Sequence, residues 1–234
     1  MQLEQYVSTH QNTFQFSREQ ASQFAKAIAD DFNPIHDIDA KRFCVPGDLL
    51  FTVALAQLGL QQQMNIRFDG MVTEGIELHF AEASENQQEI RDKNGKVYLA
   101  ITANGARSTN KEQNLKLAEQ YVAFSGKTFP HVLVPLWKEK SVMINPARPL
   151  VIYESMNVDI DSFDFEQPTV ELCGSSFEVN GKRGNVHLQF EFKDGDKVFG
   201  RGEKRMVLSG LRPYDQPAID GLIEFYDQRK TDLA

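Results

Sequence analysis

The residues best suited to chemistry lie in one short stretch, positions 31–36, with the sequence Asp-Phe-Asn-Pro-Ile-His. An Asn-Pro pair is typical of a turn, and here it separates a carboxylate, Asp31, from an imidazole, His36. Imidazole titrates close to neutral pH, and a carboxylate beside it can orient the ring or share its proton. We therefore predict that Asp31 and His36 form a general acid–base pair held by this turn.

Two helices are predicted to position the turn. Ser17 followed three residues later by Gln20 is a capping-box pattern, and it predicts a helix that begins near Arg18. This helix is expected to end at Asn33-Pro34, because the residue before a proline is pushed out of the α region. A second helix is predicted to begin at the sequence Pro-Gly-Asp of residues 46–48, and it is so apolar that it has to be buried.

The remaining patterns predict antiparallel strands and more helix. Apolar residues alternate with polar ones from about Asn65, and Asn-Gly or Asp-Gly pairs mark hairpins at residues 94–95, 180–181 and 194–195. Residues 111–140 are predicted to be helical. Both halves thus repeat one order, a helix followed by an antiparallel meander, although their residue identity is weak. We expect an α+β protein made of two such units, residues 1–112 and 113–234.

The motif resembles the signature of a known family. The pattern Asp-x-Asn-Pro-Ile-His, with a helix before it and a Gly-initiated apolar helix after it, resembles that of the MaoC-like (R)-specific enoyl-CoA hydratases and dehydratases of the hotdog superfamily. The resemblance covers roughly residues 13–109. It implies a hotdog fold, in which an antiparallel sheet wraps a long central helix. If the two halves are duplicated, the chain contains two hotdog units in tandem. It also implies an acyl-thioester substrate carried by coenzyme A or acyl carrier protein, and hydration of a trans-2-enoyl chain or the reverse dehydration.

The same resemblance implies roles for five residues. Asp31 and His36 match the pair that binds and activates the water that adds to the β-carbon. Asn33 matches a residue that shapes the turn and supports the pair. Gly47 matches the glycine that starts the central helix, whose backbone N–H polarises the thioester carbonyl. Thr52 is the only hydroxyl in the first turns of that helix, where the family often has a serine.

The chain departs from the family pattern near these residues. Ala29-Asp30 stands where the family commonly has Ser-Gly, and Pro46 stands where it has a histidine. Asp48 follows the helix-starting glycine, where a carboxylate favours the helix but repels a developing enolate. The connection from His36 to the helix is also short. Two alternatives to a hydratase therefore stay open: a non-catalytic hotdog protein that binds an acyl thioester, and a thioesterase in which Asp31 directs water to the carbonyl carbon.

Composition excludes several other classes of protein. A net charge of −8 over 234 residues argues against a nucleic-acid binder, because phosphates need clustered Lys and Arg. Basic residues near the C-terminus, Lys204 among them, alternate with acidic ones, which predicts a solvated strand face. Cys44 and Cys173 lack the spacing of metal ligands, so we expect no metal and no redox cofactor. Cys44 is expected to be a small buried thiol.

The expected location and assembly follow from similar observations. The first ten residues lack the basic and apolar regions of a signal peptide, which predicts a cytoplasmic protein. The longest apolar stretch, residues 49–60, is too short to cross a bilayer, which needs about 20 residues. No membrane span is therefore expected. The resemblance to hotdog proteins implies a site at a seam between two hotdog units. If this chain holds two units, the seam lies inside the chain; otherwise it would lie in a homodimer.

Overall fold

The computed structural model describes residues 1–233, except for the side chain of Ala83. The N-terminal half contains η1 (Leu3–Gln5), β1 (Ser8–His10), β2 (Thr13–Gln15), α1 (Arg18–Ala27), η2 (Pro34–His36), α2 (Gly47–Leu58), β3 (Leu60–Phe68), β4 (Leu78–Ser84), β5 (Gln87–Asp92) and β6 (Val97–Ser108). The C-terminal half contains α3 (Lys111–Gly126), α4 (Leu133–Glu139), β7 (Val142–Met143), β8 (Val151–Ile160), β9 (Pro168–Asn180), β10 (Arg183–Asp194), β11 (Lys197–Ser209), β12 (Arg212–Pro213) and α5 (Gln216–Leu233).

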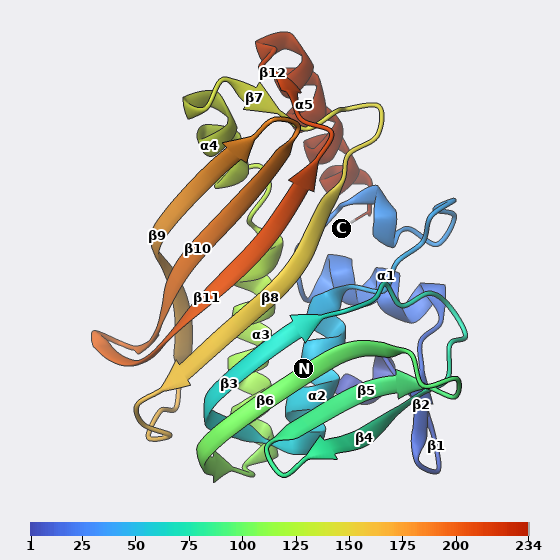
Figure 1. Ribbon diagram of the computed structural model, residues 1–234, viewed down its shortest axis with the longest axis vertical. Coiled ribbons are helices and arrows are strands. Elements are labelled where there is room, and N and C mark those ends of the chain that lie inside the picture. The colour runs from blue at the N-terminus through green and yellow to red at the C-terminus, as the bar shows by residue number, and fades with distance from the viewer. Residues whose placement is uncertain (234) are drawn as a thin grey trace.

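One ten-stranded antiparallel sheet runs through both halves, in the spatial order β1-β2-β4-β5-β6-β3-β8-β11-β10-β9 (Figure 1). The halves join where β3 pairs with β8, with Asn65 opposite Asn157. Outward from this junction the order is β3-β6-β5-β4 on one side and β8-β11-β10-β9 on the other. Within each group of four, the first strand along the chain (β3 or β8) therefore lies beside the last (β6 or β11), so the two groups share one connectivity.

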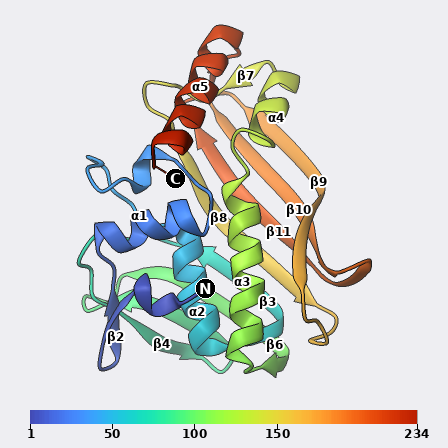
Figure 2. The ribbon, with the colours of Figure 1, turned by 180° about the vertical axis from the view of Figure 1, so that it is seen from behind.

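Two helices, α2 and α3, pack against each other on one face of this sheet, and Figure 2 shows them side by side. Residues 48–55 of α2 are all buried. Along α3 the buried apolar residues are Leu117, Ala118, Tyr121 and Val122, a spacing that gives one helical stripe. Because each fully buried Leu, Val or Phe side chain contributes about 1.5–3 kcal/mol, this layer anchors the start of α2 firmly.

The predicted α+β class and several helix boundaries are confirmed. Ser17 and Gln20 form the expected capping box at the start of α1, and α2 begins at Gly47. The prediction that the first helix reaches Asn33-Pro34 is wrong, because α1 ends at Ala27 and Asp30 has a left-handed φ of +54°. The C-terminal helix α5 was not predicted, since it buries few residues and its apolar pattern is weak.

No helix within residues 1–233 is long and apolar enough to cross a lipid bilayer.

Candidate active site

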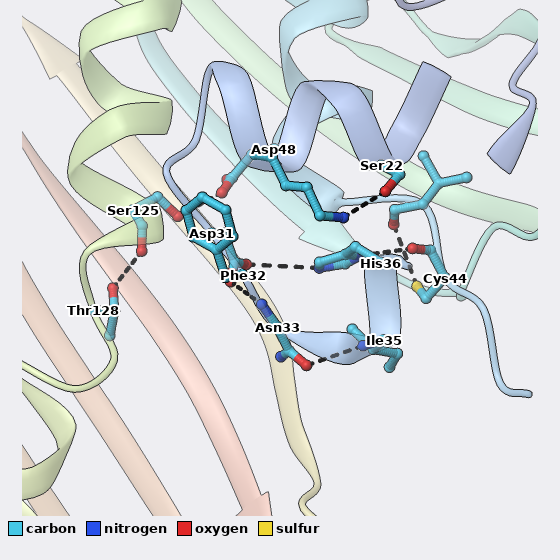
Figure 3. Close-up of polar contacts among 12 residues, drawn as sticks. Ser22, Asp31, Phe32, Asn33, Ile35, His36, Cys44, Asp48, Ser125 and Thr128 are labelled. Atoms are coloured by element: carbon cyan, nitrogen blue, oxygen red, sulfur yellow. Dashed lines mark hydrogen bonds and ion pairs between the residues drawn. The ribbon is translucent and has the colours of Figure 1, made fainter. Parts of the chain in front are cut away.

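The loop that joins α1 to α2, residues 28–46, is called the motif loop here. Within it the side chains of Asp31 and His36 face each other, and Asp31 Oδ2 lies 3.7 Å from His36 Nε2 (Figure 3). The turn between them is built by Asn33. Its backbone N–H donates to Asp31 Oδ1 at 2.9 Å, and its side-chain Oδ1 accepts from the Ile35 N–H at 3.1 Å. The structure therefore brings together three of the residues selected from the sequence.

The orientation of the His36 ring is set by a backbone carbonyl. Nδ1 lies 2.6 Å from the Cys44 oxygen, and because a carbonyl only accepts, Nδ1 must carry a proton. The Cys44 N–H in turn donates to the Ile35 oxygen at 3.0 Å, which ties the turn of the motif to the segment that leads into α2. In the neutral ring Nε2 is then a lone-pair acceptor that points toward Asp31.

The side chains of Asp31 and His36 are 28% and 12% exposed, so solvent reaches the carboxylate more than the ring. A separation of 3.7 Å is too long for a direct hydrogen bond. Asp31 Oδ2 and His36 Nε2 are both acceptors when the ring is neutral, so they suit a small molecule that donates two hydrogen bonds, such as water.

Gly47 and Thr52 lie on the buried helix α2. A Cβ atom at Gly47 would stand 3.1 Å from the Phe68 ring and 3.4 Å from the Tyr153 ring, so a larger residue would push these rings away. Thr52 is fully buried, and its hydroxyl donates to the Asp48 carbonyl at 2.7 Å, one turn back in the same helix. The Thr52 hydroxyl is thus engaged by its own helix.

A set of buried polar residues beside the motif, the buried cluster, was missed by the sequence analysis. Its centre is Ser125 of α3, whose hydroxyl donates to Asp48 Oδ2 at 2.5 Å and accepts a hydrogen bond from Lys204 Nζ. Asp48 and Lys204 are 9% and 5% exposed. The cluster also includes Tyr153, whose ring lies 4.2 Å from Lys204 Nζ, and Tyr121, whose hydroxyl bonds to that of Tyr153. Elements from both halves of the chain therefore meet at this point.

Burial dominates the electrostatics of the cluster. It raises the pKa of Asp48, while the positive charge of Lys204 and the Ser125 hydrogen bond act in the opposite direction. The charge of Asp31 also raises the pKa of Asp48 and that of His36 lowers it, because the motif lies close to the cluster. Burial lowers the pKa of Lys204, against the attraction of Asp48 and Asp31. Among the described residues, Asp48 Oδ1 is buried without a hydrogen-bond partner.

The expectation that Lys204 belongs to a solvated strand face is wrong. Side chains alternate between the two faces of β11, and Gly202, Lys204, Met206 and Leu208 are buried whereas Arg201 and Arg205 are exposed. Lys204 thus lies on the inward-facing side of β11, together with Met206 and Leu208. This strand phase is the signal in the sequence that could have identified a buried lysine.

The C-terminal helix α5 holds the motif loop from outside. The Tyr226 hydroxyl accepts from the Phe32 N–H and donates to the Asp30 carbonyl, both at 3.2 Å. Arg229 Nε donates to the Phe32 carbonyl at 3.0 Å, and Lys230 Nζ lies 2.5 Å from Asp30 Oδ2. Because burial raises the pKa of Tyr226, its hydroxyl stays protonated and able to donate. The position of Asp31, which lies between Asp30 and Phe32, therefore depends on α5.

Two hollows on the described surface lie away from the motif. One is formed by α5 alone, around Asp220, Glu224 and Asp227, and the other lies over the outer face of the C-terminal strands, around Glu178, His187 and Arg205. Neither hollow is lined by Asp31 or His36. Across residues 1–233, no group of three or more His, Cys, Asp or Glu side chains is placed to hold a metal ion.

Comparison with known families assigns the chain to one family. The family model described as "Protein of unknown function (DUF3581)" matches residues 1–217. The chain belongs to this family. The DUF3581 model spans every strand of the sheet and stops at the beginning of α5, so Tyr226, Arg229 and Lys230 lie outside the matched residues. No curated protein matches the sequence.

Solved structures identify the fold of this DUF3581 member. A conserved protein from Alicyclobacillus acidocaldarius, described as having a hot dog fold, is 9% identical, and the match covers 92% of this chain and 99% of that one with a TM-score of 0.50. The predicted hotdog fold is thereby confirmed. Two further structures are less similar to this chain. A MaoC-like dehydratase is 12% identical, and the match covers 87% of this chain and 98% of that one with a TM-score of 0.45. An acyl-CoA thioesterase II from Mycobacterium marinum is 9% identical, with coverages of 92% and 100% and a TM-score of 0.42.

Proposed function

We propose that this protein is a hydratase or dehydratase that acts on an enoyl thioester carried by coenzyme A or acyl carrier protein, with Asp31 and His36 as its catalytic residues. One observation carries the proposal: two hydrogen-bond acceptors, Asp31 Oδ2 and His36 Nε2, face each other at 3.7 Å while the Cys44 carbonyl fixes the proton on Nδ1. The match of the motif to the MaoC-like signature supports the same assignment.

In the hydration direction, a water molecule donates one hydrogen bond to His36 Nε2 and one to Asp31 Oδ2. As its oxygen attacks the β-carbon, Nε2 takes a proton, and the second proton stays on the new hydroxyl group, held by Asp31. Electrons move to the thioester oxygen, where the N-terminal end of α2 at Gly47 stabilises the enolate. The imidazolium then returns its proton to the α-carbon. Water is thus added across the double bond, and His36 is neutral again.

The arrangement of the chain in this proposal is two hotdog units, residues 1–112 and 113–234. The strand orders β3-β6-β5-β4 and β8-β11-β10-β9, each following a helix packed on the sheet, support the duplication. The seam that a homodimer of single units would form then lies within one chain, between α2 and α3. In this arrangement only the first unit supplies the motif, and Asn33 keeps its role in shaping the turn.

A second candidate is a non-catalytic role in binding an acyl thioester. It is favoured by the residues that depart from the MaoC-like pattern around the motif, which are Ala29-Asp30, Pro46 and Asp48. A thioesterase would use the same Asp31 carboxylate, with water directed to the carbonyl carbon instead of the β-carbon. The two enzymatic functions differ in the product that each releases, and the binding role releases none.

The test is to follow the loss of the enoyl absorbance of crotonyl-CoA and of longer trans-2-enoyl-CoA substrates. Asp31→Asn and His36→Gln should each lower kcat by about 10²-fold or more, the usual contribution of a positioned acid or base. His10→Gln and Asp39→Asn, at exposed positions, are matched controls and should stay near wild type. Release of free thiol would identify a thioesterase. Bound acyl-CoA in native mass spectra without turnover would identify the binding role and overturn the hydratase.

A further inference from the structure

Lys204 is a buried cation that the C-terminal half places beside the motif of the N-terminal half. It reaches inward from β11, donates to the Ser125 hydroxyl and lies over the Tyr153 ring. Through Ser125 it is linked to Asp48, in the first turn of α2. None of these residues belongs to the Asp31–His36 motif, and the water-activation steps above do not use them.

Asp48 poses a problem for the proposed reaction. Negative charge would develop on the thioester oxygen at the start of α2, and a carboxylate one residue after Gly47 would repel it. The repulsion would be strong, because Asp48 is buried and charges interact more strongly away from water. Either the Asp48 carboxylate is neutralised, or the helix end cannot stabilise an enolate.

Stability alone does not account for the lysine. Replacing a buried ion pair by apolar residues of similar size is often neutral or stabilising, because two charges must be taken out of water. Gly202, Met206 and Leu208, on the same inward face of β11, show that apolar or small residues suit this position. A lysine retained there is better explained by an electrostatic role.

We propose that Lys204 is a positioning residue of the active site, which neutralises Asp48 through Ser125 and so allows negative charge to develop at the N-terminal end of α2. The inference rests on the proposed function and extends it. It makes the active site composite: the first unit supplies Asp31, His36 and Gly47, and the second supplies Ser125 and Lys204. The sequence motif alone would then be insufficient for turnover.

The test is a double-mutant cycle in the full chain. Lys204→Met keeps most of the side-chain length without the charge and should lower kcat on an enoyl thioester by about thirtyfold, since Asp48 is left uncompensated. Asp48→Asn should leave kcat within about threefold of wild type, and the double variant should recover the kcat lost in Lys204→Met. Lys197→Met, at an exposed position of the same strand, is the matched control.

Melting temperatures of the same variants give a readout that needs no turnover. Each single variant should melt below wild type by about 10 °C, and the double variant should melt above both, because neither buried charge is left alone. A Lys204→Met protein with wild-type kcat, or a folded double variant as slow as Lys204→Met, would overturn the inference. A wild-type chain without turnover would overturn the proposed function, and the melting temperatures would still decide whether Lys204 neutralises Asp48.

Discussion

The hydroxyl of Tyr226 accepts a hydrogen bond from the backbone N–H of Phe32 at 3.2 Å, although the two residues are 194 positions apart in the sequence. This bond fixes the backbone immediately after Asp31 against α5. Removing the hydroxyl with Tyr226→Phe leaves the buried Phe32 N–H without its partner, and we expect a loss of about 1–3 kcal/mol in the free energy of unfolding. Urea denaturation measures it. Tyr214→Phe, which removes an exposed hydroxyl bonded to Gln216, is the control and should change little.

A second prediction concerns the contact between α3 and the motif loop. A Cβ atom at Gly126 would lie 1.8 Å from the Ala29 carbonyl oxygen, which is backbone and has no room to move. Gly126→Ala should therefore destabilise the protein by about 3 kcal/mol or more and displace the motif loop. Gly221→Ala, in α5 with open space around it, should instead stabilise by about 0.5–1 kcal/mol. Equal stability of the two variants would contradict the close approach.

Asp30 occupies a backbone conformation that favours glycine. Its φ of +54° is left-handed, and its partly exposed carboxylate pairs with Lys230. Asp30→Gly should be more stable than Asp30→Ala by about 1 kcal/mol, because alanine pays the steric cost of this conformation and glycine does not. Both variants lose the Lys230 pair, so their difference isolates the backbone. The prediction fails if thermal unfolding ranks alanine above glycine.

The pH dependence of stability should reveal the burial of Asp48. Burial raises the pKa of Asp48 above its ordinary value of 3.8, so between these two values the folded chain keeps a proton that the unfolded chain has lost. The contribution of Asp48 to stability is therefore greatest below about pH 3.8 and falls as the pH rises through the raised pKa. We expect Asp48→Asn to gain stability relative to wild type as the pH rises across this range, measured by urea unfolding. A constant difference would argue against a raised pKa.

The two cysteines should differ in reactivity. Burial raises the pKa of the Cys44 thiol to about 11, whereas Cys173 is exposed. At pH 8 only roughly one Cys44 thiol in a thousand is then ionised, and the thiolate is the reactive form. Cys44 is partly buried, so iodoacetamide should label Cys173 first and Cys44 far more slowly, as peptide mass spectrometry can determine. Equally fast labelling of both in the folded protein would show that Cys44 is accessible.

Local chemistry in the sequence was sufficient to predict much of the fold. The capping box at Ser17 and the Asn-Gly and Asp-Gly turns were predicted correctly, and Gly181 and Gly195 have the left-handed φ of +58° that such hairpins require. The motif also predicted that Asp31 and His36 would converge, because a turn of only four intervening residues keeps the two side chains close together. These features depend only on residues close together in the chain.

The features that were missed depend on residues far apart. A lysine on a strand is usually exposed, and Lys204 is buried where it meets Ser125 of α3 and Tyr153 of β8, which lie far from it in the sequence. Likewise, α5 has a weak apolar stripe, and its importance lies in its bonds to Asp30 and Phe32. The strand phase around Lys204 is the one local signal, and the bonds made by α5 leave no mark within a short window of sequence.

The contacts between α5 and the motif loop also have a consequence for biosynthesis. Tyr226, Arg229 and Lys230 lie within the last ten positions of the chain and bond to the loop 192 to 200 positions earlier. During translation, the sheet can assemble from its N-terminal strands onward while these residues are still inside the ribosome. The loop that holds Asp31 and His36 can reach its final contacts only after α5 has emerged, so the geometry of this loop is completed later than the sheet that supports it.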